Sequence, residues 1–235
     1  MDYQKLWSSQ NSSGHRSTGV NFWQKKSLEH IFVLGNDKNE QTIDIGCGAG
    51  ELLEYLINSN VNVTEAIDYS ETMLQAAKNR LKHSSIVFSS PDTLSHLSNT
   101  SCATWMACES INQYLDAHTQ SIILDTFNNN SHAKSLYLFD TVCPTRFMLW
   151  NKTKILDYVS PTSRLSYLRH IYGFLKGLMQ SVFIPNKFKS CNIGIMGYAF
   201  SPQFFMKQAM KKGLSIEIIS SMYYEYRYHI IIKKP

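Results

Sequence analysis

The sequence TIDIGCGAGE, at residues 42–51, constrains the fold of this chain more than any other stretch. Asp44 belongs to an apolar run, and three glycines, Gly46, Gly48 and Gly50, then alternate with single residues before a helical pattern begins. Glycine permits positive φ and close backbone approach, which a sharp turn from strand to helix requires when a ligand lies against it. The free N–H groups at the start of the next helix favour an anionic or carboxylate ligand. The stretch therefore predicts a strand–turn–helix ligand site.

Strand-like and helix-like segments alternate from about residue 40 to residue 140. The predicted strands span residues 41–45, 61–67, 86–89, 102–107 and 135–141. The helical patterns between them span residues 51–57, 70–81 and 118–128, and Ser70 is the expected N-cap of the second. Strands that alternate with helices of this length form right-handed crossovers and a parallel sheet.

The end of the chain departs from this alternation. A helix is predicted over residues 202–212, and two β-rich runs follow at 215–221 and 226–233 with a very short connection. Such a pair of strands forms an antiparallel hairpin. We therefore expect an α/β fold, with a Rossmann-like, doubly wound sheet of seven strands, mostly parallel, that ends in an antiparallel C-terminal hairpin.

Two carboxylates narrow the choice of ligand. Asp68 ends the second predicted strand, where an acidic residue can bind both hydroxyls of a ribose. Asp44 precedes the first glycine, where its charge would repel a pyrophosphate and attract an ammonium group. The pattern DxGxGxG therefore favours a nucleoside that carries an amino-acid group over a dinucleotide.

Five segments resemble the class I S-adenosylmethionine-dependent methyltransferases. They are TIDIGCGAGELLEYL, VTEAIDYSETMLQAAKNRL, IVFSSPD, WMACESINQYL and LYLFDTV, in the order that the family shows. The resemblance implies a methyltransferase with S-adenosyl-L-methionine as cofactor and S-adenosyl-L-homocysteine as product. By matching position, it implies cofactor contacts at Asp44, Gly46, Cys47, Gly48, Gly50, Asp68, Tyr69, Met73, Asp92, Thr93 and Cys108.

Some positions have simpler interpretations or depart from the family. The glycines would also suit an ordinary tight turn, and Asp92 follows Pro91 in what could be a plain turn. Ala103 stands where the fourth strand of the family usually begins with Asp, which leaves the substrate geometry near this strand less defined. The segment SINQY, at residues 110–114, replaces the motif that nucleobase-amine methyltransferases carry there, which disfavours adenine or cytosine amino groups as acceptors.

Methyl transfer from a sulfonium is a direct displacement, so the protein mainly aligns the acceptor and excludes water. A base is needed only when the acceptor must lose a proton. The candidate catalytic residues are Glu109, His15 and His170. Glu109 follows the fourth strand and suits a cofactor or substrate contact better than a base, whereas a solvated loop is the favoured explanation for His15. No metal-ligand pattern is visible, and the prediction for a metal is none.

A basic segment follows the fifth strand. The 235-residue chain has a net charge of +5, yet residues 159–216 hold eight Lys or Arg and no Asp or Glu. Within this segment, residues 164–183 have helical periodicity with one apolar face. A lid helix packed on the sheet explains the pattern, and so does a cover over an anionic acceptor or a helix on an anionic membrane.

These observations predict a single methyltransferase domain over residues 1–235. It divides into an N-terminal arm (1–39), a cofactor-binding core (40–143), a basic helical insertion (144–200), and a last helix with its hairpin (201–235). The expected acceptor is a small-molecule or glycan-type compound, anionic or lipid-linked, methylated at oxygen or nitrogen. The alternatives are an RNA methyltransferase, which the basic segment favours and the acidic body disfavours, and a non-catalytic cofactor-binding subunit.

The cysteine pattern and the N-terminal residues indicate the cellular location of the protein. The five cysteines form no CxxC pair, and the N-terminus has no apolar signal sequence. A cytoplasmic location is therefore expected, with peripheral membrane contact through residues 164–183 as an open alternative. The oligomeric state does not follow from the sequence.

Overall fold

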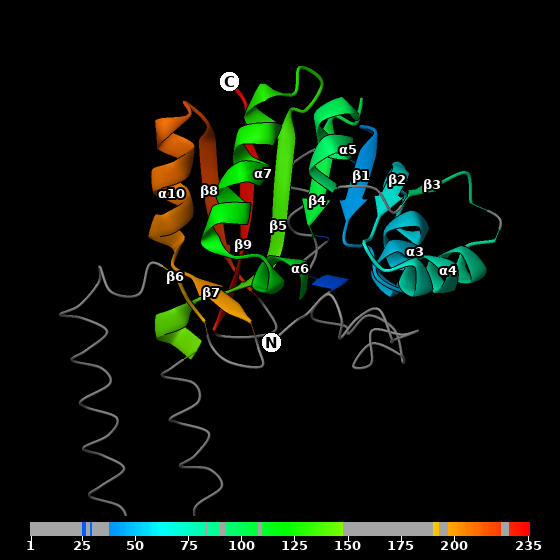
Figure 1. The fold of residues 1–235 in the computed structure, drawn as a ribbon, viewed down its shortest axis with the longest axis horizontal. Coiled ribbons are helices and arrows are strands. Elements are labelled where there is room, and N and C mark those ends of the chain that lie inside the picture. Colours follow the sequence, from blue (N-terminus) through cyan, green and yellow to red (C-terminus); the bar gives the residue numbers. More distant parts are fainter. Residues whose placement is uncertain are drawn as a thin grey trace, which may run out of the picture.

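The computed structural model describes residues 25–26, 29, 38–82, 84–89, 93–107, 110–147, 190–192, 197–221 and 226–235. A seven-stranded sheet, in the order β3-β2-β1-β4-β5-β9-β8, forms the centre of this part of the chain (Figure 1). Its strands are β1 (Thr42–Ile45), β2 (Val63–Ile67), β3 (Val87–Ser89), β4 (Thr104–Ala107), β5 (Ser135–Val142), β8 (Ser215–Ser220) and β9 (Arg227–Lys233). Each lies within two residues of its predicted bounds.

The directions of the strands confirm the expected topology. β1 pairs in parallel with β2 and β4, and β2–β3 and β4–β5 are parallel as well. β9 runs antiparallel to both β5 and β8. The order of the sheet reverses between β1 and β4, and ligands of open α/β sheets bind at the carboxyl edge beside such a reversal. The fold thus places the expected ligand site where the glycine turn lies.

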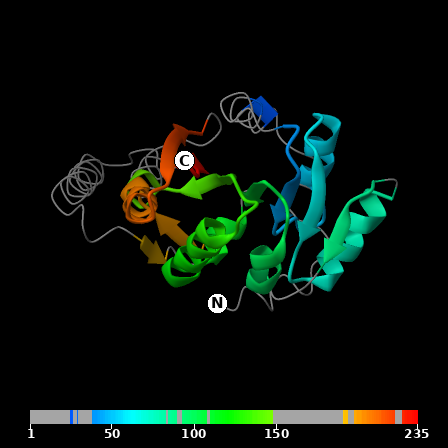
Figure 2. The same cartoon turned by 90° about the horizontal axis from the view of Figure 1, so that it is seen from above.

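Helices cover both faces of the sheet (Figure 2). The helices are α3 (Glu51–Asn58), α4 (Glu71–Arg80), α5 (Thr93–Asn99), α6 (Ser110–Tyr114), α7 (Ala117–Asn129) and α10 (Pro202–Lys211). Side chains alternate along β5, so that Leu136 and Leu138 pack with α7 and α10 while Tyr137 and Phe139 pack on the side of α3. A sheet buried on both faces needs such continuous apolar strands, which is why every residue of β5 is buried.

The caps of the helices have local causes. The Ser70 hydroxyl accepts a hydrogen bond from the backbone N–H of Met73 at 3.3 Å, which confirms the predicted N-cap of α4. Asp116 caps α7 in the same way, since its Oδ1 accepts from the backbone N–H of Thr119 at 2.8 Å. The short helices α5 and α6 have no apolar periodicity long enough to have been predicted.

The segment 144–200 contains two strands that the expectation of a helical insertion missed. β6 (Ser190–Asn192) and β7 (Tyr198–Phe200) form an antiparallel pair outside the main sheet. Each has three residues, too few for an alternating pattern to stand out. The helix predicted at residues 164–183 lies outside the described residues. Within the ranges that the structure describes, no helix is long and apolar enough to cross a membrane.

Candidate cofactor site

The turn between β1 and α3 lies at the carboxyl edge of the sheet. Gly46, Gly48 and Gly50 have φ values of 75°, 56° and 81°. The N–H groups of Gly46 and Cys47 both donate to the carbonyl oxygen of Ile67, at 2.7 and 3.1 Å, which fixes the turn to the end of β2. The predicted strand–turn–helix unit is confirmed, and all three glycines adopt a backbone conformation that other residues rarely adopt.

Because Gly46 has no side chain, the side chain of Ile111 can pack directly against its backbone. A Cβ at this position would lie 2.3 Å from Cδ1 and 3.0 Å from Cβ of Ile111. Ile111 belongs to α6, which follows β4 (Figure 1). The contact between Gly46 and Ile111 therefore links the two strands that flank the expected ligand site.

Asp68 joins the glycine turn to the loop after β2. Its Oδ2 accepts from the backbone N–H of Gly48 at 2.9 Å, and its Oδ1 accepts from the backbone N–H of Ser70 at 2.9 Å. Burial raises the pKa of this carboxyl group, and the two N–H donors act against that shift. A carboxylate has about four acceptor positions, so two bound N–H groups leave capacity for the hydroxyls of a ligand.

The glycine turn lies in a negative electrostatic field. Cys47 is buried, and its pKa is raised well above the usual value by desolvation and by the carboxylates of Asp44, Asp68 and Glu51. The thiol therefore stays protonated and is no nucleophile. Asp44 and Asp68 would stabilise a cation bound at the turn and would repel a pyrophosphate, whereas the charge of Glu51 is offset by Arg80.

Arg80 holds the turn against the helices that flank it. Its Nε donates to the carbonyl oxygen of Ala49 at 3.1 Å, and its guanidinium lies 3.6 Å from Glu51 and 3.3 Å from Glu54. Glu51 is buried, so this partner reduces the cost of its charge. One side chain of α4 thus fixes the start of α3 relative to the turn.

The remaining residues predicted for the cofactor site are placed only in part. Tyr69 is half-buried in the loop after Asp68, and Met73 is buried in the first turn of α4. Thr93 begins α5, and only its backbone is described. The predicted contacts Asp92 and Cys108 and the candidate catalytic residues Glu109, His15 and His170 lie outside the described residues.

A second polar cluster, which the sequence did not predict, surrounds α6 at the same edge of the sheet. The side-chain amide of Asn112 donates to the carbonyl oxygens of Ala107 in β4 and Phe139 in β5, at 3.2 and 3.3 Å. The Gln120 amide donates to the carbonyl oxygen of Asn112 at 3.1 Å. These bonds fasten α6 across the ends of two parallel strands. The available signal was the pair of adjacent amides in SINQY, directly after a buried strand.

Polar side chains of β9 extend this cluster to β5. Arg227 is buried and donates to the carbonyl oxygen of Asp140 at 2.8 Å and to Oε1 of Gln113 at 3.4 Å. Asp140 has a φ of 53°, which is strained for a residue with a side chain. Its N–H donates to Nδ1 of His229 at 3.0 Å, and Ser221 donates to its carboxylate at 3.4 Å. Strand β9 thus holds β5 in an unusual conformation at the rim of the site.

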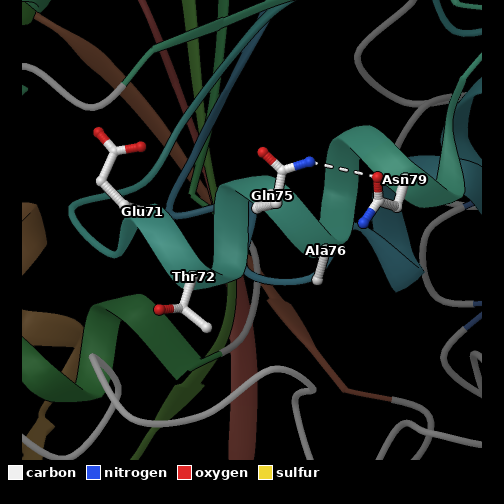
Figure 3. A pocket seen from close by; sticks show the side chains of 5 residues that line it. All are labelled: Glu71, Thr72, Gln75, Ala76 and Asn79. Carbon is white, nitrogen blue, oxygen red and sulfur yellow. Dashed lines mark hydrogen bonds between the residues drawn. The ribbon is translucent and has the colours of Figure 1, made fainter.

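A hollow lies on the exposed surface of α4. Its lining consists of Glu71, Thr72, Gln75, Ala76 and Asn79, and Gln75 donates to Asn79 at 3.2 Å (Figure 3). All five residues come from one helix, and none is a predicted cofactor contact. An open helix surface of this kind is no enclosed ligand site. In the described ranges, no group of three or more His, Cys, Asp or Glu side chains could hold a metal ion.

Comparisons with known proteins agree with this geometry. Residues 43–103 match a family model described as a methyltransferase domain, and the match includes the glycine turn and Asp68. A comparison with curated proteins gives no match.

Solved structures share the fold. Magnesium protoporphyrin IX methyltransferase from Synechocystis PCC 6803, with bound SAM, has a TM-score of 0.57 and 14% identity, covering 100% of this chain and 98% of that one. The methyltransferase domain of bacterial CtHen1 has a TM-score of 0.57 and 15% identity, over 91% and 100% of the two chains. A S-adenosylmethionine-dependent methyltransferase from Clostridium acetobutylicum ATCC 824 has a TM-score of 0.56 and 13% identity, over 91% and 92%. At these identities the likeness establishes the fold.

Proposed function

We propose that this chain is a class I S-adenosylmethionine-dependent methyltransferase and that it transfers the methyl group to an oxygen or nitrogen atom of a small-molecule or glycan-type acceptor. The observation that carries the cofactor assignment is the geometry of the glycine turn, in which three residues have positive φ and the Asp68 carboxylate is held against the turn by the N–H groups of Gly48 and Ser70. The carboxylates of Asp44 and Asp68, which also raise the pKa of the buried Cys47 thiol, support a positively charged ligand there. A sulfonium with an amino-acid ammonium group suits these charges, whereas a dinucleotide does not.

The residues of the turn divide the work of holding the cofactor. Asp68 would accept hydrogen bonds from the ribose hydroxyls, because it ends β2 and its carboxylate is already oriented by Gly48 and Ser70. Asp44 would face the ammonium group, and the N–H groups at the start of α3 would face the carboxylate. Tyr69, Met73, Asp92, Thr93 and Cys108 complete our proposed set of contacts. When bound, the cofactor supplies a methyl group that its positive sulfur has already activated.

On the acceptor side, we propose Glu109 as the residue nearest the chemistry. It follows Ala107, the last residue of β4, by two positions in the sequence, and β4 is one of the two strands that flank the sheet reversal. A carboxylate there can orient an acceptor hydroxyl or amine and remove its proton. His15 and His170 are the further candidates for a base, each from a segment that we propose to cover the site.

The segment that connects β5 to β6 favours a small, anionic acceptor. β5 ends at this edge, and the pair β6–β7 lies beside α6 there (Figure 1). The chain between residues 147 and 190 therefore starts and finishes at the rim of the site, which suits a cover that excludes water. Residues 159–216 hold eight basic residues and no acidic ones, so such a cover would favour negative charge. The alternative for this basic segment is contact with an anionic membrane, because residues 164–183 combine an apolar face with basic residues.

Transfer of a labelled methyl group tests the acceptor class. The full chain is incubated with methyl-tritiated S-adenosylmethionine and a cell extract separated by molecular mass. The expected result is label in a low-molecular-mass or glycolipid fraction that resists nuclease and protease. Label that nuclease releases from the high-mass fraction would replace this proposal with the RNA alternative. Cofactor binding without transfer in any fraction would support the non-catalytic alternative.

A further inference from the structure

The short helix α6 lies between the glycine turn and the pair β6–β7. On one side, Ile111 fills the space where a side chain on Gly46 would lie. On the other side, the carbonyl oxygen of Gln113 lies against Gly197, the residue before β7. Two residues of one helical turn thus contact two loops that are distant in the sequence.

The contact with Gly197 is between two backbones. A Cβ at Gly197 would lie 2.0 Å from the carbonyl oxygen of Gln113 and 2.9 Å from its carbonyl carbon. No side-chain rotation can relieve such an overlap, because main-chain atoms must move, either those of α6 or those of residue 197. A side chain at residue 197 therefore strains the contact between the β6–β7 pair and the helix.

The other contacts of α6 restrict how it can respond. Asn112 fastens the helix to β4 and β5, and Arg227 holds the Gln113 side chain while it donates to Asp140. Asn112, Gln113 and Arg227 are all buried. Packed interiors transmit a displacement to their neighbours and do not absorb it. Ile111, at the end of α6 nearest to Gly46, is the side chain through which a shift reaches the cofactor turn.

We infer that Gln113 and Gly197 are positioning residues for the cofactor. Gly197 seats the β6–β7 pair against the Gln113 carbonyl, α6 sets the place of Ile111, and Ile111 sets the conformation of the turn at Gly46. Packing of the β6–β7 pair and binding of S-adenosylmethionine are therefore energetically coupled. This inference rests on the proposed cofactor site.

Two glycine substitutions test the coupling. Gly197→Ala and Gly213→Ala both place alanine at a positive φ, of 85° and 68°, so both carry the cost of that conformation. A Cβ at Gly213 has nothing within 4 Å, which makes it the matched control. By calorimetry on the full chain, we expect Gly197→Ala to raise the Kd for S-adenosylmethionine at least about fivefold. Gly213→Ala should change the Kd less than about twofold.

A double-mutant cycle shows whether Ile111 transmits the effect. In an Ile111→Ala background, Gly197→Ala should change the Kd less than about twofold, because the side chain that reaches Gly46 is gone. A purely structural loss would leave the two effects multiplicative. A Gly197→Ala protein that binds the cofactor like the wild type, or a multiplicative cycle, would overturn the inference.

A second pair of variants keeps the inference testable if Gly197→Ala fails to fold. Gln113→Ala removes the acceptor for Arg227 and should raise the Kd for S-adenosylmethionine, whereas Gln113→Glu keeps an acceptor oxygen and should restore it. Wild-type affinity in Gln113→Ala contradicts the positioning role. If the wild-type chain does not bind S-adenosylmethionine, the proposed function itself is wrong. If the wild type binds it and the variants bind it equally well, only the coupling is wrong.

Discussion

The glycine turn and the α6 cluster border the same edge of the sheet but are built differently. At the turn, backbone groups do most of the work: three positive φ values and the N–H donors of Gly46, Cys47 and Gly48 define the site. Around α6, buried side chains define the structure, since Asn112 and Arg227 donate hydrogen bonds to carbonyl oxygens of neighbouring strands.

This difference determines what each region can tolerate. A backbone site depends on a few positions where only glycine or a carboxylate suits. A side-chain cluster can be rebuilt one residue at a time, although each buried polar atom left unpaired is costly. We therefore expect substitutions at the turn to reduce cofactor binding first, and substitutions around Arg227 to reduce stability first.

Asp68 gives the largest expected effect. Asp68→Ala removes the proposed acceptor of the ribose hydroxyls, and hydrogen bonds to charged groups are each worth about 1.5–3 kcal/mol. We expect the Kd for S-adenosylmethionine to rise about 100-fold, as measured by calorimetry.

Asp68→Asn separates binding from stability. Burial raises the pKa of Asp68, so the ionised group disfavours the native state at neutral pH. The asparagine variant removes the buried charge but keeps only one acceptor oxygen for the N–H groups of Gly48 and Ser70, so the two effects on stability oppose each other. It should therefore bind the cofactor poorly while its unfolding temperature at pH 7 stays close to that of the wild type. Unchanged affinity in either variant would remove Asp68 from the site.

Gly46→Ala should have the next largest effect. Its Cβ would overlap Ile111 at a φ of 75°, and αL strain alone costs about 1–2 kcal/mol. We expect cofactor affinity to fall about 10- to 30-fold. Gly46→Ala combined with Ile111→Ala should recover part of the loss, because the overlap disappears while the strain remains. No recovery in the double variant would mean that Ile111 does not limit the turn.

Arg227→Met tests the other region. The variant leaves the Asp140 carbonyl and the Gln113 amide without this donor, and an unsatisfied buried acceptor costs about 1–3 kcal/mol. Urea unfolding should show a loss of about 2 kcal/mol, with a smaller change in cofactor affinity than Asp68→Ala causes. A greater loss of affinity in Arg227→Met than in Asp68→Ala would reverse the division between the two regions.

Asp116 provides the smallest effect, which depends on pH. The Thr119 N–H and hydroxyl lower the pKa of Asp116, so its charge stabilises the native state above the ordinary pKa of aspartate. Asp116→Ala should cost about 1 kcal/mol at neutral pH. This cost should vanish as the pH falls through the lowered pKa, as urea titrations at several pH values would show. A loss that persists in strong acid would indicate a cause other than the cap.

The turn could be predicted because its determinants lie close together in the sequence. Gly46, Gly48 and Gly50 act within one turn, and Asp68 follows one helix and one strand later. The N-cap at Ser70 and the C-terminal hairpin also have local causes, and both are confirmed.

The α6 cluster could not be predicted because its partners are distant. Asn112 binds a carbonyl group 27 positions away, and Gln113 binds a guanidinium 114 positions away. A local sequence pattern cannot reveal partners so far apart in the chain. The segment SINQY therefore informed the prediction only because it differs from the motif of nucleobase-amine methyltransferases. The strands β6 and β7 were missed for a related reason, because contacts with α6 and Tyr228 stabilise them more than their own composition does.

A comparison of the affinities for two ligands tests the central claim most directly. S-adenosylmethionine and NADH are titrated separately into the wild-type chain by calorimetry at one ionic strength. The account predicts saturable binding of S-adenosylmethionine and none of NADH, because Asp44 lies in β1 just before the turn, where its charge would repel a pyrophosphate. Binding of NADH that equals or exceeds that of S-adenosylmethionine would contradict it.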